Sequence, residues 1–423
     1  MSAPPSTSRP SDPDPAPDLH PLHLAVALDG AGWHPAAWRE PGARPHELFT
    51  PGHWADLVAE AERGLLDFVT IEDGLGPQSS HPTEPDERTD QVRGRLDAVL
   101  VAARVAPLTR HIGLVPTVVA THTEPFHVSK AIATLDYVSN GRAGLRIQVS
   151  GRTGEAAHFG RRTFPKLGVE EYDTPAGDDL LTELFDEAAD HVEVVRRLWD
   201  SWEDDAEIRD AATGRFVDRD RLHPIDFEGR YFSVRGPSIT PRPPQGQPVV
   251  SALAHLSIPY GLVGRAADIG YVTPRDADHA RDIVAEIRTA QSAAGRAGDT
   301  VHVFGDLVVF LDVEPGAAEA RKARLDALAG EAHTSDARIF TGTPAELADL
   351  LLEWRAAGLT GFRLRPGVLA HDLERITREL VPELQRRGVF RSAYEADTLR
   401  GLLGLARPAN RYTTARAAGA VRR

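Results

Sequence analysis

The stretch IGLVPTVVATHTEPFHVSKAIATLDYVSNGRAGLRIQV, residues 112–149, holds two short β-rich runs separated by a segment with helical periodicity. The runs are Ile112–Ala120 and Leu145–Val149, and the segment between them is Phe126–Val138. Short apolar runs rich in Val and Ile predict buried strands, and a helix between two such strands is typical of parallel pairing. This β-α-β unit predicts an α/β protein with a parallel sheet.

The same alternation continues in both directions along the chain. Six further strands are predicted, at Leu22–Leu28, Phe68–Ile71, Pro248–Leu253, Ile269–Val272, Val301–Leu311 and Phe362–Leu364. Five further helices are predicted, at His53–Arg63, Leu96–Ala106, Asp179–Trp202, Asp276–Ala294 and Pro344–Ala357. Eight strands alternating with helices are the number that closes a (β/α)8, or TIM, barrel. A doubly wound open sheet is the alternative, and it is disfavoured because no G-x-G-x-x-G follows the first strand.

The segments outside this repeat define the domain organisation that we expect. Residues 21–412 form one barrel domain, between a disordered Pro-, Ser- and Asp-rich tail at 1–20 and a basic tail at 413–423. Two insertions are expected, at about 151–177 and 203–247, of which the first follows the fourth strand and is the better lid candidate. The Leu-rich segment Phe390–Tyr412 is expected to pack on the barrel or on a second subunit.

Composition excludes several functional classes. The 423 residues carry a formal net charge of −14, which argues against nucleic-acid binding because that binding depends on Lys and Arg neutralising phosphates. There is no cysteine, so disulfides and thiolate metal sites are excluded, and the histidines show no metal-binding spacing. No apolar run is long enough to span a membrane, and no export signal is recognisable. We therefore expect a cytoplasmic protein without a metal site.

Four stretches of the sequence carry a family resemblance. They are ATLDYVSNGRAG (Ala133–Gly144), HVEVVRRLWDSWEDDA (His191–Ala206), IDFEGRYFSVRGPSITPRPPQGQPVV (Ile225–Val250) and VPELQRRGVFRSAYEADTLRGLLGLARPANRY (Val381–Tyr412). Together they resemble the nitrilotriacetate monooxygenase and pristinamycin synthase group, which also contains dibenzothiophene-sulfone and long-chain-alkane monooxygenases. That group belongs to the bacterial-luciferase-like flavin-dependent monooxygenases, and the likeness extends from Leu22 to Tyr412.

The resemblance implies a two-component enzyme. Such a protein is a homo-dimer or tetramer of barrels that takes reduced FMN from a separate flavin reductase and uses O2 as co-substrate to oxygenate a small organic molecule. The cofactor carries most of the chemistry, so the protein supplies position, electrostatics and the exclusion of water. The expected list of catalytic side chains is therefore short.

The resemblance also implies cofactor-binding residues, each of which has a structural alternative. Asp73 follows the second strand beside the flavin, and otherwise it caps the next turn. Thr117 and Thr121 approach the flavin from the third strand, and otherwise they reflect the β-propensity of threonine. Ser150 is retained from the family's fourth strand. Ser257 corresponds to the serine of the phosphate loop, and otherwise it is the N-cap of the following helix.

Four other positions depart from the family pattern. Arg146 replaces a family asparagine, Leu181 a polar residue, Phe185 a phosphate-binding tyrosine, and His255 the glycine of the phosphate loop. Phe185 and His255 are still candidate cofactor-binding residues, although loss of the tyrosine hydroxyl should weaken phosphate binding and His255 could either crowd the phosphate or, if protonated, contact it. Arg146 is a candidate for both catalysis and cofactor binding, because a guanidinium can bind phosphate or stabilise an anionic reduced flavin. Its alternative is an ion pair with Glu72 or Asp73.

These departures keep two other functions open. One is a binding or regulatory protein with a degenerate flavin site, and the other is a deazaflavin-dependent oxidoreductase. His122 and His158 are candidate proton donors or substrate contacts near the barrel rim, because histidine titrates near neutral pH. Their alternative is that of ordinary polar loop residues.

Overall fold

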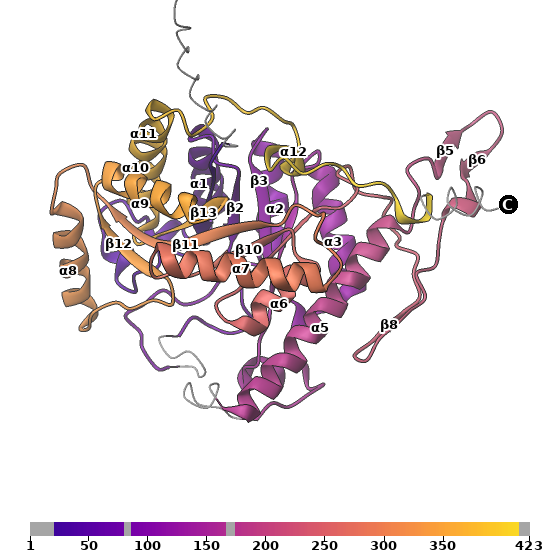
Figure 1. The fold of residues 1–423 in the computed structure, drawn as a ribbon, viewed down its shortest axis with the longest axis horizontal. Helices are drawn as coiled ribbons and strands as arrows, with labels where there is room; N and C mark the ends of the chain where they lie inside the picture. Colours follow the sequence, from indigo (N-terminus) through magenta and orange to yellow (C-terminus); the bar gives the residue numbers. More distant parts are fainter. Residues whose placement is uncertain (1–20, 80–85, 166–173, 414–423) are drawn as a thin grey trace, which may run out of the picture.

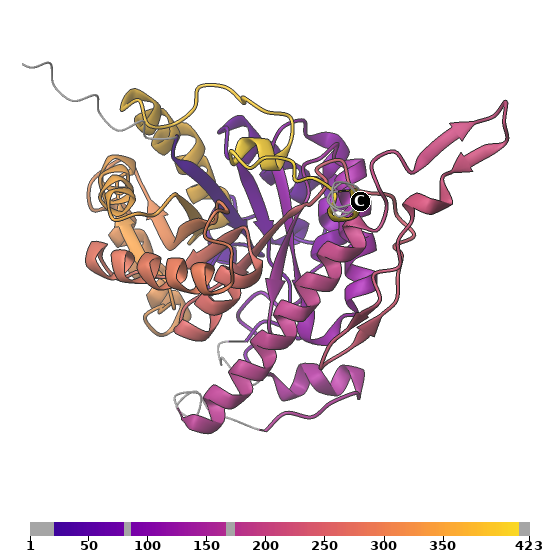
Figure 2. The ribbon, with the colours of Figure 1, turned by 45° about the vertical axis from the view of Figure 1, so that its right-hand side comes forward.

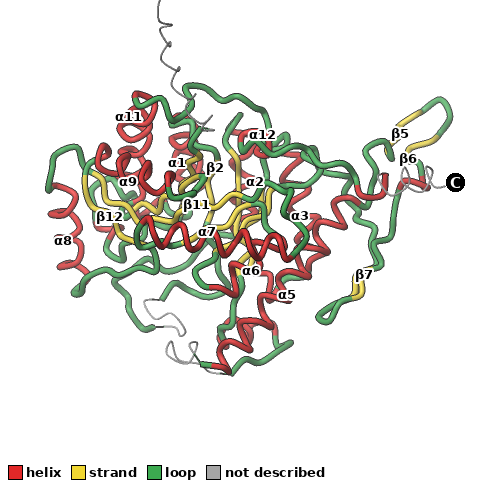
Figure 3. Tube along the Cα trace, in the orientation of Figure 1, coloured by secondary structure: helices red, strands yellow, loops and turns green. Residues whose placement is uncertain are grey.

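The computed structural model describes residues 21–79, 86–165 and 174–413. The tail expected at 1–20 and all of the basic tail except Thr413 lie outside the described residues. Figures 1 and 3 show strands at the centre of the molecule with helices around them. None of the described helices combines the length and the apolar character needed to cross a membrane.

Eight parallel strands form a closed barrel, which confirms the predicted TIM-barrel fold. In order around the barrel they are β1 (His23–Leu28), β2 (Phe68–Ile71), β3 (Gly113–Val119), β4 (Gly144–Gln148), β9 (Val249–Leu253), β10 (Ile269–Val272), β11 (His302–Leu311) and β13 (Gly361–Pro366). The barrel closes because β1 pairs with both β2 and β13. Every one of these strands lies within a few residues of its predicted range.

The helices lie outside the strands. They include α1 (Pro51–Arg63), α2 (Ala98–Val105), α3 (Pro125–Val138), α5 (Pro175–Asp200), α6 (Ser257–Ala266), α7 (Ala277–Ala293), α8 (Ala317–Ala329), α9 (Pro344–Ala356), α10 (Leu369–Arg375) and α11 (Val381–Arg386). Polar N-caps fix several of their starts. Thr174 accepts a hydrogen bond from the amide of Gly177, so α5 begins at Pro175, before the predicted Asp179.

One strand of the main sheet was absent from the prediction. β12 (Arg338–Gly342) pairs with the second half of β11, at Leu307–Leu311, while the first half of β11 pairs with β10 and the middle with β13. Most of β12 is half-buried or exposed, so its sequence lacks the continuous apolar run that marked the other strands. It places the loop before it, residues 330–337, at the C-terminal rim of the barrel.

The C-terminal segment closes the N-terminal end of the barrel. Leu399, Leu403 and Leu405 pack against inward-facing residues of the strands, among them Phe68 and Phe304. The short helix α12 (Leu399–Leu402) approaches so closely that a Cβ added at Gly113 would lie 2.6 Å from Leu399 Cδ1. Of the two predicted positions for the segment Phe390–Tyr412, the structure shows packing on the barrel of the same chain.

The two predicted insertions have different structures. Within residues 151–177, the helix α4 (Thr153–Phe159) follows β4. The second insertion, 203–247, contains two hairpins, β5 (Glu207–Asp210) with β6 (Arg215–Val217), and β7 (Phe227–Glu228) with β8 (Ser233–Val234). Figure 2 shows the β5–β6 hairpin extending away from the barrel. The division of the chain into one domain with two tails stays a prediction, as does the lid role.

Replacement of Leu399 tests the closure of the barrel floor. Leu399 is fully buried, so Leu399→Ala should lower the free energy of unfolding by about 2–5 kcal/mol through lost burial and the cavity left behind. Leu328→Ala is the control, because that side chain is 43% exposed and its loss should cost at most about 0.5 kcal/mol. Urea denaturation measures both, and equal stabilities for the two variants would contradict this packing.

Candidate active site

The barrel interior changes from apolar to charged toward the C-terminal ends of the strands. The buried rings of Phe68, Tyr271 and Phe304 form what we call the aromatic floor of the barrel. Above it lies a group of side chains that we call the ionic layer: Arg146, Glu72, Asp306, Arg363 and Arg365. Several of its contacts join strands that are not neighbours in the sheet, since Glu72 follows β2 while Arg146 lies on β4 and Arg363 on β13. Such contacts show that these side chains point into the barrel.

Arg146 is fully buried and pairs with Glu72, which is one of the two alternatives that the sequence left open. Its Nε donates to Thr117 Oγ1 at 2.8 Å, and its Nη2 donates to Gln148 Oε1 at 3.2 Å as well as to Glu72. Its Nη1 is buried without a hydrogen-bond acceptor among the described residues. Both N–H bonds of Arg146 Nη1 are therefore without an acceptor in this part of the structure.

The other half of the ionic layer centres on Asp306. Arg363 donates through Nε and Nη2 to Asp306 at 2.8 and 2.6 Å and through Nη1 to Glu72 at 3.0 Å. Arg365 also contacts Asp306 and donates to Asp336 at 2.8 Å. The guanidinium of Arg363 lies 4.4 Å from the ring centre of Tyr271, so the layer rests directly on the aromatic floor.

Burial and ion pairing shift the pKa values of the groups in this layer in opposite directions. Burial favours the neutral forms of Glu72 and Asp306, but neighbouring guanidinium groups outweigh it and lower the pKa of both carboxyl groups. For Glu72 these groups are Arg146 and Arg363, and for Asp306 they are Arg363 and Arg365. For Arg146 burial dominates and lowers the pKa, because Glu72 compensates only in part. Three guanidinium groups therefore share the carboxylates Glu72, Asp306 and, at the rim, Asp336.

Asp73 takes the capping role in this structure. Its carboxylate accepts hydrogen bonds from the amides of Gly74 at 2.7 Å and Ala98 at 2.9 Å, the second of which is the first residue of α2. Burial raises the pKa of Asp73 despite these hydrogen bonds. The side chain thus faces α2 rather than the ionic layer, and a contact with flavin stays a prediction.

The two predicted threonines lie at different depths. Thr117 donates to Ile71 O at 2.8 Å and accepts from Arg146, so its hydroxyl belongs to the ionic layer. Thr121 lies at the rim, where its Oγ1 accepts from the amide of Ser150 at 3.0 Å. Ser150 Oγ accepts from the amide of Arg152 at 3.3 Å. The structure therefore brings Thr121 and Ser150 together, one level above Thr117 and Arg146.

The predicted phosphate loop lies between β9 and α6. Ser257 is the first helical residue and is exposed, while the N-cap is Leu256, whose side chain caps nothing. The N-cap alternative for Ser257 is therefore wrong, because the serine lies one position inside the helix. Amides in the first turn of a helix have no partner within it. The helix accordingly presents free amides and the Ser257 hydroxyl at the rim.

His255 lies beside these amides and turns toward another loop. Its Nδ1 lies 3.1 Å from Asp336 Oδ2, and its Nε2 is buried without a partner among the described residues. Burial lowers the pKa of His255, although Asp336 acts in the opposite direction. Its side chain is thus held by Asp336, next to Arg365 of the ionic layer.

The remaining predicted residues lie on α5 and on the loops after β3 and β4. Phe185 and Leu181 are half-buried on α5, and Phe185 packs against the main hydrophobic core. His122 is buried, stacks on Phe159 with ring centres 5.1 Å apart, and has a pKa lowered by burial. His158, on α4, is exposed.

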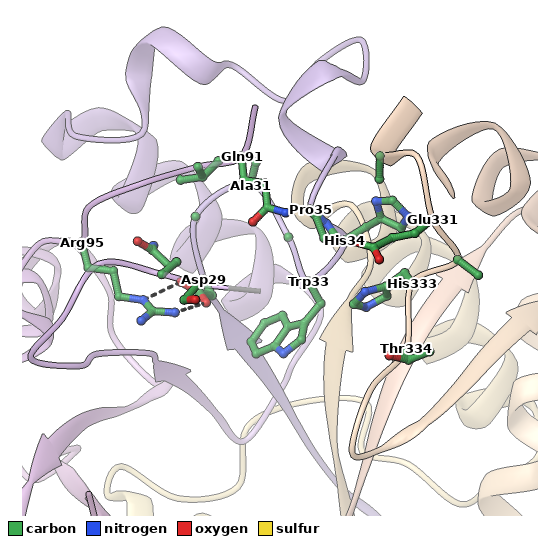
Figure 4. A pocket seen from close by; sticks show the side chains of 17 residues that line it. Asp29, Ala31, Trp33, His34, Pro35, Gln91, Arg95, Glu331, His333 and Thr334 are labelled. Atoms are coloured by element: carbon green, nitrogen blue, oxygen red, sulfur yellow. Dashed lines mark hydrogen bonds and ion pairs between the residues drawn. The ribbon is translucent and has the colours of Figure 1, made fainter. Parts of the chain in front are cut away.

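A cavity of about 370 Å³ lies beside the ionic layer at the rim and was not predicted. Figure 4 shows Asp29 and Arg95 on one side, His34, His333 and Glu331 on the other, and Trp33 between them. Asp29 directly follows β1, so its place after a strand was a usable signal. His333 lies on the loop before the strand that the sequence did not reveal.

The fold is that of a (β/α)8-barrel enzyme, and the candidate functional groups gather at the C-terminal mouth of the barrel. The chain belongs to the luciferase-like monooxygenases, because the model of that family matches residues 31–334. The predicted family and enzyme class are thereby confirmed.

The relatives cover nearly the whole chain. N-acetyl-S-(2-succino)cysteine monooxygenase of Bacillus subtilis is 30% identical, over 92% of this chain and 98% of its own length. Nitrilotriacetate monooxygenase component A of Aminobacter aminovorans is 28% identical, over 92% and 97%. The crystal structure of a long-chain alkane monooxygenase superposes with a TM-score of 0.80 at 22% identity, over 91% of this chain and 95% of that one.

Removing the central carboxylate tests the ionic layer. Asp306→Asn leaves two buried guanidinium groups with too little negative charge, and it should lower the free energy of unfolding by about 3–5 kcal/mol. Asp349→Asn removes an exposed partner of Arg387 and should cost less than about 1 kcal/mol. If chemical denaturation gave similar small losses for both, the layer would not contribute to stability.

The same layer predicts the pH dependence of stability. The pKa values of Glu72 and Asp306 lie below their ordinary values of 4.5 and 3.8, so both groups bind fewer protons in the folded than in the unfolded protein. Their stabilisation is complete above the unfolded-state values and is lost as the pH falls below them. Urea titrations from neutral pH into this acid range should show a smaller loss for Asp306→Asn than for the wild type. An unchanged slope would contradict the assignment.

Proposed function

We propose that the protein is the oxygenase component of a two-component FMN-dependent monooxygenase. It receives reduced FMN from a separate flavin reductase, uses O2 as co-substrate and oxygenates a small organic molecule. The nearly full-length match to monooxygenases carries this proposal. The name of one relative, component A, supports a separate partner. We propose a homo-dimer or tetramer, as in the sequence interpretation.

Several of the described residues at the mouth of the barrel support a flavin site there. A phosphate group needs hydrogen-bond donors and positive potential, which the uncapped start of α6 and the hydroxyl of Ser257 supply. A ring edge bearing carbonyl oxygens needs donors, and Arg146 Nη1 is a buried donor without an acceptor. Thr121 adds a hydroxyl whose hydrogen is not used in its contact with Ser150.

Bound reduced flavin would supply the electrons that activate O2. The chain's own residues would then hold and shield the reacting groups. Arg146 would donate one hydrogen bond from a position fixed by Glu72 and Thr117, so little reorganisation would accompany binding. His122, kept neutral at physiological pH by its lowered pKa, would be able to accept a proton at Nε2 or donate one there.

Titration separates this function from the two alternatives. Calorimetry with oxidised FMN, reduced FMN under anaerobic conditions and a deazaflavin should show binding of reduced FMN, followed by O2 consumption on aeration. Preferential binding of deazaflavin would instead indicate a hydride-transfer enzyme. The absence of binding by all three would overturn the proposal and favour a binding or regulatory protein, which the positions of His255 and Phe185 would then explain.

Restoring the family tyrosine tests the phosphate site. Phe185→Tyr adds a hydroxyl, and one new hydrogen bond to the phosphate should strengthen FMN binding by about 1 kcal/mol, or roughly fivefold. Phe216→Tyr is the matched control, because Phe216 lies on the β5–β6 hairpin and is 64% exposed. Calorimetric titration measures both. An equal affinity in the two variants would exclude Phe185 from the phosphate site.

A further inference from the structure

The cavity between β1 and the loop before β12 borders the proposed flavin site. Its wall includes Asp29 and Arg95, and the charge of Arg95 acts on both Glu72 and Asp73. Trp33, on the same wall, lies against Arg365 of the ionic layer, with 5.9 Å between its ring centre and the guanidinium carbon of Arg365. The cavity thus adjoins the mouth of the barrel on the side where β1 and β2 end, and its volume is in the range of small-molecule sites.

The charges around this cavity are matched in pairs. Arg95 forms a two-pronged contact with Asp29, through Nε at 3.0 Å and Nη2 at 2.6 Å. Arg365, behind Trp33, is bound by Asp306 and Asp336. Glu331 pairs with Arg88 at 2.7 Å and reaches solvent. Among the described residues, the cavity therefore presents no guanidinium or carboxylate that lacks a counter-charge.

The two histidines of the cavity are neutral at physiological pH. His34 Nδ1 accepts from the amide of Ala36 at 3.0 Å, so Nε2 carries the proton and donates to Asp326, also at 3.0 Å. Burial lowers the pKa of His34, although Asp326 opposes this, and burial with repulsion from His34 lowers the pKa of His333 to about 4. Neither imidazole supplies positive charge for an anionic ligand.

Two uncharged side chains of the cavity wall, Gln78 and His333, have hydrogen-bonding atoms without a partner among the described residues. Gln78 donates through Nε2 to Gly94 O at 3.1 Å, which leaves its Oε1 buried without a donor among the described residues. His333 Nε2 is likewise unpartnered. Trp33 contributes a half-buried aromatic surface. These groups fit a ligand with a flat apolar part and a hydrogen-bond donor.

We propose that this cavity is the substrate site and that it selects an uncharged, flat molecule bearing an amide-like donor, while it discriminates against carboxylates. The inference rests on the proposed function, because it names the substrate class of that enzyme. A charged substrate would lose water without meeting a free counter-charge, and that loss is costly in a partly enclosed site. Polycarboxylates such as nitrilotriacetate, for which one relative is named, fall outside the class.

Three fragments of one shape test the selectivity. Benzamide, benzoate and benzamidine are neutral, anionic and cationic, and each is titrated by NMR without flavin to saturation or to its solubility limit. Benzamide should bind at least about tenfold more tightly than either charged fragment. The reason is that benzoate and benzamidine would each bring a charge out of water without meeting a free counter-charge in the cavity. Equal or tighter binding of benzoate or benzamidine would overturn the proposal, and so would the absence of binding by benzamide.

A single substitution should reverse this preference. Asp29→Asn frees Arg95 inside the cavity, so benzoate should then bind at least as tightly as benzamide. Asp349→Asn is the matched control, since Asp349 pairs with Arg387 outside the cavity and should leave the preference unchanged. Trp33→Leu should remove benzamide binding. Unchanged selectivity in Asp29→Asn, or unchanged benzamide binding in Trp33→Leu, would place the fragments elsewhere.

The fragments and the flavin report on different claims. If FMN fails to bind while the fragment selectivity holds, the proposed function falls and the cavity assignment stands. If FMN binds and the fragments show no selectivity, only the cavity assignment falls. Circular dichroism of each variant checks that it is folded, and the wild-type comparison of the three fragments does not depend on any variant.

Discussion

The structure depends on the placement of opposite charges inside a closed barrel. Arg146, Glu72, Asp306 and Arg363 are removed from water at the level where the strands approach their C-terminal ends. An isolated charge in such a place would be very costly, so each group requires the others, and the strands that carry them must keep one register. Below this level the interior is aromatic and aliphatic, and above it the loops hold polar groups at the rim. The layer thus separates the part of the barrel that stabilises the fold from the part available to ligands.

This arrangement leaves selected groups free. Arg146 donates through Nε to Thr117 and through Nη2 to Glu72 and Gln148, while its Nη1 has no acceptor among the described residues. The start of α6 has no capping side chain, and Thr121 retains a hydroxyl hydrogen. We propose that a planar cofactor with a phosphate tail satisfies these groups. The neighbouring cavity has the opposite character, since its charges are paired and its free groups are neutral. The two proposals together describe a charged cofactor beside an uncharged substrate.

The structure shows the expected kind of contact for some candidate residues and a different one for others. Thr117 and Arg146 are in contact, as residues of neighbouring strands with inward-facing side chains must be. Asp73 instead caps α2, because an aspartate one residue past a strand can turn either way and the sequence does not reveal where the next helix begins. Asp306 and Arg363 escaped notice, since a charged residue within an apolar run looks the same whether it faces solvent or a buried partner. The partner lies far away in the sequence, and only the closed barrel brings the two together.

The sequence by itself determined the barrel and its family. The reason is local, because alternating apolar runs and helical segments encode parallel β-α units, and eight of them close one kind of sheet. Tertiary structure decided which charges meet, where β12 joins β11, and how Trp33, His34 and His333 surround one cavity. Those features arise between segments distant in the chain, so no pattern within a single segment contains them.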